Sequence, residues 1–299
     1  MDTQFWWFFD AMALSAILIS IYRSGKRGFS KTAVIIAGCV ISLVLSVAAG
    51  GKTSGWIYDI GIKKSKDAKI EMVLKGSDMA QKTKNYIDSL GYGISTDELM
   101  IGQIFSSGGD ITDRLYEYLT EIDKRHTDSI ESFENSMSDG YAEIMENILE
   151  KGLSRYEASE AAEKIKKDTD GFNVFLRMMQ NGSQKEAALY IEENYTASAS
   201  IDIIRTVCFI IILFALSAAA LFISNEINKS GSVKGAGEIA EPILGGLLGI
   251  AEGIMIIFLA AVLVKLLIFI SSDEMMFFNS SAIEKTFLFK HIYRLAMKL

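Results

Sequence analysis

The sequence is poor in the residue types that build disulfides, metal sites and catalytic centres. Its 299 residues include two cysteines, two histidines and one proline. Cys39 and Cys208 both fall within apolar segments, which favours small buried side chains over a disulfide or a metal ligand. His126 and His291 are far from each other and from either thiol, so no zinc-ligand spacing exists. The chain also lacks the P-loop, HExxH and GxSxG motifs. We therefore predict a non-enzymatic protein with no cofactor and no metal.

Positive charge is scarce in the middle of the chain. Residues 52–200 carry 18 basic and 27 acidic side chains, a net charge of −9, whereas the whole chain has −7. This acidic balance argues against nucleic acid as a partner. Proline is absent between residues 55 and 198 and strict alternation is rare, so strands are not expected there. We predict about six short helices packed in a small bundle.

Local signals in residues 52–200 are helical. Serine-to-glutamate spacings at Ser95, Ser154 and Ser183 each predict a capping box, in which hydroxyl and carboxylate bond reciprocally to the backbone. Asp110, Asp113 and Glu117 share one predicted helix face. So acidic a segment produces such clusters by chance, and we interpret them as solvated surface rather than a cation site.

Long apolar segments frame this polar interval, two before it and two after it. Each is near or above the roughly 20 residues that a helix needs to cross a bilayer. They are Phe5–Ile21, Lys31–Gly50, Ile203–Ser224 and Ile243–Ile270. The sequence thus predicts an all-α, multi-pass membrane protein with four transmembrane helices. The lipid bilayer is therefore an expected partner. Its expected parts are transmembrane helices 1 and 2 with a basic loop (1–51), a helical domain (52–200), transmembrane helices 3 and 4 (201–271), and an amphipathic basic tail (272–299).

Basic residues between the first two apolar segments predict the direction of threading. The segment 22–30 and the residue after it contain no acid and four basic residues: Arg23, Lys26, Arg27 and Lys31. By the positive-inside rule this loop is cytoplasmic, which places the N-terminus and residues 52–200 outside the cytoplasm. The loop 225–241 is then cytoplasmic and the tail lies outside. The basic tail residues, Lys285, Lys290, Arg294 and Lys298, argue against the last step.

Ionisable residues inside or beside the apolar segments are candidates for function, because burying a charge in lipid costs about 2.5–3.5 kcal/mol or more. The candidates are Asp10, Asp202, Arg205, Glu252 and Lys265. We expect Asp10 to pair with Arg205 near the outer interface and Lys265 to snorkel toward that interface. Glu252 lies about two and a half turns inside its helix. Two interpretations of Glu252 stay open: a proton or cation relay, and a hydrogen bond to a serine or backbone group across the bundle.

Three glycines in the last apolar segment recur every four residues: Gly245, Gly249 and Gly253. They line one helix face, where another backbone can approach closely. We interpret this face as packing within the chain, with an oligomer seam as the alternative. Pro242 stands where it can begin a helix without losing a hydrogen bond.

These features resemble the colicin V production protein (CvpA) family of bacterial inner-membrane proteins. The resemblance lies in Asp10, in Arg27-Gly28-Phe29, in the glycine repeat between Leu244 and Gly253, and in the tail segment Asn279–Ile283. It departs from the family in two ways. The connection over residues 52–200 is long, and Glu252 stands where the family commonly has a basic residue.

Membership of that family implies toxin production or secretion, or cell-envelope homeostasis, with secretion or envelope proteins or a second copy of the chain as partners. Two alternatives remain. One is a small ion-coupled transporter or channel that uses Glu252, and the other is an envelope sensor whose outer bundle binds a ligand.

Overall fold

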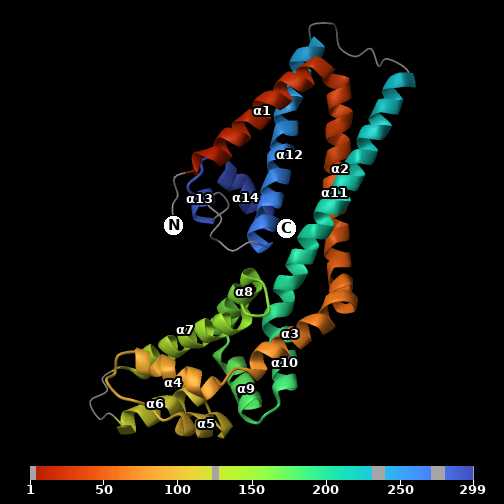
Figure 1. Ribbon diagram of the computed structural model, residues 1–299. Coiled ribbons are helices and arrows are strands. Elements are labelled where there is room, and N and C mark those ends of the chain that lie inside the picture. Colours follow the sequence, from red (N-terminus) through yellow and green to blue (C-terminus); the bar gives the residue numbers. More distant parts are fainter. Residues whose placement is uncertain (1–4, 123–127, 231–239, 271–279, 299) are drawn as a thin grey trace. The chain divides into compact units, whose positions relative to one another are not determined.

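The computed structural model describes residues 5–122, 128–230, 240–270 and 280–298, and within these ranges all regular structure is helical. The chain forms two compact units (Figure 1). We call residues 1–57 with 202–299 the membrane unit, and residues 58–201 the polar unit. The polar unit is thus a single insertion between the second and third long apolar helices.

The membrane unit contains the long apolar helices. Its helices are α1 (Trp7–Arg27), α2 (Phe29–Ile57), α11 (Ala197–Ser230, whose first turn belongs to the polar unit), α12 (Ala240–Ile270), α13 (Ser280–Glu284) and α14 (Phe289–Met297). Four continuous helical stretches among the described residues are long and apolar enough to cross a membrane. Each of them includes one of the helices α1, α2, α11 and α12. Large apolar side chains on their outer faces, such as Leu18, Val44 and Phe214, are exposed. Such a surface is stable in lipid rather than in water, so the chain is a multi-pass membrane protein.

The connection between the first two apolar helices is tighter than the sequence predicted. Residues 22–30 were expected to form a loop, yet α1 continues to Arg27 and α2 begins at Phe29. Gly28 alone breaks the helices, with a φ of 84° and its N–H donating to the carbonyl of Ser24. Glycine adopts this left-handed conformation without the steric cost of a Cβ atom.

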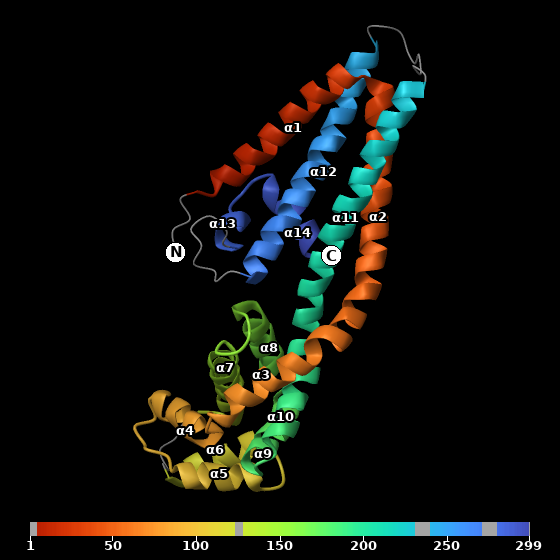
Figure 2. The ribbon, with the colours of Figure 1, turned by 45° about the vertical axis from the view of Figure 1, so that its right-hand side comes forward.

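Helices α1 and α14 both lie beside α12 (Figure 2). The three helices share one apolar core, to which α11 contributes. The rings of Phe9 and Phe289 stack with centroids 4.9 Å apart, and those of Phe209 and Phe258 meet edge to face at 6.4 Å. The apolar face of α14 is therefore buried against the long helices, rather than forming a separate tail. Its buried residues are Phe289, Tyr293 and Ala296.

The polar unit has more helices than the predicted six. They are α3 (Lys63–Lys75), α4 (Met79–Ser89), α5 (Glu98–Ser106), α6 (Ile111–Ile122), α7 (Ile130–Leu149), α8 (Arg155–Lys167), α9 (Thr169–Gln180) and α10 (Gln184–Ile191). Two short π-helical turns, η1 (Tyr58–Ile62) and η2 (Glu192–Thr196), stand next to the boundaries of the unit. One apolar core holds the unit together, with side chains that include Leu74, Phe105, Leu115, Tyr141, Met145 and Phe172.

One of the three predicted capping boxes is correct. Ser154 and Glu157 bond reciprocally at the start of α8. The prediction at Ser95 is wrong because Asp97 caps α5, accepting the backbone N–H of Leu99 at 2.9 Å. Ser183 precedes α10 but accepts no capping hydrogen bond through its side chain.

Candidate functional site in the membrane helices

The three repeat glycines hold α12 against the backbone of α1. A Cβ atom at Gly245 would lie 2.6 Å from the carbonyl oxygen of Ser24. At Gly249 it would lie 2.6 Å from the Cα of Ile21, and at Gly253 2.8 Å from the Cα of Ile17. These separations are shorter than carbon atoms tolerate, so only glycine permits the observed approach. The glycine face is thus occupied by a helix of the same chain.

This close approach brings Glu252 onto the polar face of α1. The Ser24 hydroxyl donates to Oε2 of Glu252 at 2.5 Å, and Nη1 of Arg27 donates to Oε1 at 2.9 Å. Ser24 and Arg27 are three residues apart and so lie on one face of α1. The Glu252 side chain is 18% exposed and that of Arg27 is 35% exposed. Both carboxylate oxygens therefore have a donor, and one of these donors is a cation.

A cavity lies beside this ion pair. It is an open cavity of about 250 Å³ lined by α2, α11 and α12, and Arg27 and Glu252 form part of its wall. The other lining side chains are mostly apolar, with Cys39 and Ser217 as further polar groups. The cavity can accept an apolar molecule or chain, but it offers a small ion few polar partners besides the ion pair.

Asp10 has a different partner from the one predicted. Its carboxylate accepts three backbone N–H groups, from Phe287 at 2.6 Å, Leu288 at 2.9 Å and Phe289 at 3.0 Å. A carboxylate at this position satisfies the free N–H groups at the start of α14. The predicted pair between Asp10 and Arg205 is therefore wrong, and Asp10 instead fastens the C-terminal helix to α1.

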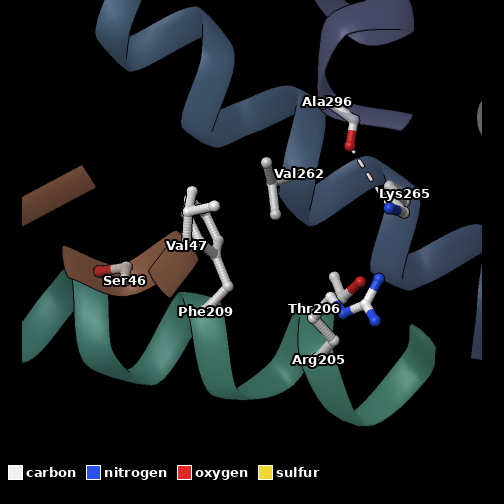
Figure 3. Close-up of a pocket in the computed structure, with 8 residues that line it drawn as sticks. All are labelled: Ser46, Val47, Arg205, Thr206, Phe209, Val262, Lys265 and Ala296. Carbon is white, nitrogen blue, oxygen red and sulfur yellow. Dashed lines mark hydrogen bonds between the residues drawn. The ribbon is translucent and has the colours of Figure 1, made fainter. Parts of the chain in front are cut away.

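The other ionisable residues lie where α11 and α12 face each other. Nη1 of Arg205 binds the carboxylate of Asp202, one turn earlier on α11, at 3.1 Å. Lys265 on α12 is 4% exposed, so the prediction that it snorkels is wrong. Its amine donates to the carbonyl of Ala296 at 3.3 Å (Figure 3). Arg205 and Lys265 line one small cavity with Ser46 and Thr206.

Arg27, Gly28 and Phe29 form the turn between α1 and α2. Arg27 holds Glu252, Gly28 provides the turn, and Phe29 begins α2 with a 38% exposed side chain. The tail motif begins at Asn279, which lies outside the described residues. Among the described residues no cluster of three or more His, Cys, Asp or Glu side chains could hold a metal ion.

The polar unit contains buried charges that the sequence interpretation missed. Lys66 is 3% exposed and lies 3.1 Å from the carboxylate of Glu157, and both side chains bond to the hydroxyl of Ser200. Burial raises the pKa of Glu157, but the Lys66 ammonium and the Ser200 and Ser154 hydroxyls outweigh it and hold this pKa below its usual value. The capping-box spacing identifies Glu157 in the sequence, but nothing in the sequence indicates its contact with Lys66, which lies 91 positions away.

A second buried contact joins the two π-helical turns. The hydroxyl of Tyr58, the first residue of η1, donates to the carboxylate of Glu192, the first residue of η2. Both side chains are buried, and Lys63 lies 3.6 Å from the other carboxylate oxygen. The two ends of the polar unit, where the chain enters and leaves it, are thereby tied to each other.

No protein-family model, curated protein or solved structure matches this chain.

Proposed function

We propose that this chain is a non-enzymatic integral membrane protein of the colicin V production type, acting in toxin production or secretion or in envelope homeostasis. The observation that carries the proposal is the state of Glu252. A relay carboxylate must exchange partners, whereas both oxygens of Glu252 are held by Ser24 and Arg27. The glycine contacts that place Glu252 there hold the backbones of α1 and α12 in close contact along three turns. Glu252 thus acts as a fixed link between two helices.

The proposed threading places the basic turn in the cytoplasm and the polar unit outside. In support, the α1–α2 turn lies beside the start of α12, where a Cβ atom at Gly25 would be 3.3 Å from the carbonyl of Pro242. The α1–α2 turn and the start of α12 are therefore at the same end of the membrane unit. Asp10, at the opposite end of α1, contacts the start of α14, which agrees with a tail on the other side.

One observation favours the ion-coupled alternative. The cavity of about 250 Å³ borders both members of the Arg27–Glu252 pair. A transporter could expose Glu252 to this cavity after the bond to Ser24 breaks. In that case the charge of Glu252, and not only its shape, is required for activity.

Complementation of a deletion strain separates the two proposals. Glu252→Gln keeps the shape and leaves Arg27 able to reach water, so a structural role predicts normal membrane accumulation and a rescued envelope phenotype. Arg27→Gln leaves the carboxylate of Glu252, whose side chain is 18% exposed, without its cation, and a charge left without its partner destabilises the fold. We therefore expect Arg27→Gln to lower the amount of protein in the membrane. If Glu252→Gln accumulates normally yet fails to rescue the strain, the structural proposal is wrong.

A further inference from the structure

Lys265 is a buried cation with few partners. Its amine has three N–H groups. One donates to the carbonyl of Ala296 at 3.3 Å, and the amine also lies 5.4 Å from the centre of the Phe269 ring. Among the described residues, no carboxylate lies within ion-pair distance of this amine. Because burial of an unpaired charge is costly, a negative partner would stabilise the charged form of this amine.

Arg205 presents a second unsatisfied donor to the same place. Its Nη1 binds Asp202, but its Nε–H is buried and has no hydrogen-bond partner among the described residues. Figure 3 shows its guanidinium rising from α11 toward the segment of α12 that carries Lys265. The two cations therefore converge from facing helices. Among the described residues of this cavity Asp202 is the one counter-charge, and the side chains of Arg205 and Asp202 are 39% and 42% exposed.

The other polar groups of this cavity do not supply the missing charge. The hydroxyl of Ser46 donates to the carbonyl of Ser42 at 2.6 Å, and that of Thr206 donates to the carbonyl of Asp202 at 2.8 Å. Two positive charges and one negative charge leave a net charge of about +1 on this group of side chains. The lining is completed by apolar side chains such as Phe209 and Val262.

The size of the cavity limits what can neutralise that charge. It encloses about 20 Å³, and a cavity of roughly 10–15 Å³ is enough for one water molecule. A single-atom ion fits this space, whereas a sulfate, a phosphate or an organic carboxylate is too large.

We propose that the cavity between Arg205 and Lys265 binds one monovalent anion of halide size, such as chloride or bromide. The free N–H groups of Lys265 and the Nε–H of Arg205 donate to the anion, and its charge balances the group. The anion would then join α11, which carries Arg205, to α12, which carries Lys265.

The test is thermal unfolding of the full chain in detergent or nanodiscs, titrated from sodium gluconate to sodium chloride or bromide at constant ionic strength. We expect a saturable rise in unfolding temperature on the order of 2–4 °C. Lys265→Met and Arg205→Gln should each abolish this halide-specific rise. Lys298→Met, which removes an exposed lysine from the end of the chain, should keep it.

Two results would overturn the proposal. The first is a wild-type unfolding temperature that does not change when gluconate is replaced by halide, which would mean that the cavity holds only water. The second is a halide-specific rise of the same size in Arg205→Gln or Lys265→Met. If Lys265→Met does not fold, the wild-type titration and the Arg205→Gln titration still decide, and anomalous scattering from bromide locates the ion directly.

Discussion

Replacement of Gly249 by alanine tests the close packing of α12 against α1, which we call the α1–α12 seam. The added Cβ atom would lie 2.6 Å from the Cα of Ile21, 2.7 Å from the carbonyl oxygen of Ser20 and 2.9 Å from the nitrogen of Ile21. All three are backbone atoms, so no side chain can rotate away. The helices must separate by roughly 0.5–1 Å, which forfeits a quarter to a half of each contact energy along the seam. We expect a loss of about 1–3 kcal/mol in the free energy of unfolding.

Gly246 provides a matched control on the same helix. A Cβ atom there meets Ile21 at 3.7 and 3.8 Å, which is ordinary van der Waals contact. Alanine is also the better helix former, by about 1 kcal/mol in water. Gly246→Ala should therefore be neutral or stabilising. The assay is reversible or scan-rate-controlled thermal unfolding of both purified variants in the same lipid nanodisc, together with their accumulation in the membrane.

The separation of α1 from α12 also has a local signature. Gly249→Ala should weaken the bonds from Ser24 and Arg27 to Glu252, because these cross the same seam. Crosslinking of cysteines introduced on facing positions of α1 and α12 should slow in this variant. Equal stability of Gly249→Ala and Gly246→Ala would refute the packing described for this seam.

Three further predictions concern the rest of the chain. Asp10→Ala should release the start of α14 and speed backbone hydrogen exchange there, by an amount equivalent to about 1–3 kcal/mol, and unchanged exchange would contradict the anchoring role. The lowered pKa of Glu157 means that its ionised form stabilises the fold above its usual value of 4.5, and that this contribution is lost as the pH falls through the lower folded-state pKa. Glu157→Gln should thus be less stable than wild type at pH 7, and its stability should fall less than that of wild type below pH 4.5. Unfolding followed by circular dichroism measures both effects, and identical acid profiles of the two proteins would exclude this role. In a cysteine-free background on intact cells, a membrane-impermeant thiol reagent should label Glu134→Cys and not Lys26→Cys, both at exposed positions, and the reverse pattern would invert the proposed threading.

The four long helices were predictable from the sequence because their signal is local. Runs of apolar residues long enough to span a bilayer are visible without knowledge of their neighbours. Their ends were less predictable: α1 extends through Arg27 because charged residues continue a helix that only Gly28 interrupts. The predicted number of short helices in the polar unit was too low. The sequence signals that end one short helix and begin the next are weak, so neighbouring helices were counted as one.

The partners of the ionisable residues were not predictable from one sequence. The glycine repeat indicates a face of close approach, but not which helix fills it. Ser24 and Glu252 are 228 positions apart, and only the packing of α12 on α1 brings them together. Asp10 was assigned to Arg205 because both stand near helix ends on the same predicted side. The N–H groups at the start of α14, which Asp10 in fact binds, leave no trace in the sequence pattern.

Proton flux in reconstituted vesicles tests the central proposal, a fixed structural role for Glu252, most directly. Wild-type protein and Glu252→Gln, inserted in equal amounts, would be compared with empty vesicles under an imposed pH gradient and read with a trapped pH-sensitive dye. The structural role of Glu252 predicts that both proteins leave the gradient as empty vesicles do. Proton flux by the wild type that disappears in Glu252→Gln would contradict it and establish the ion-coupled alternative.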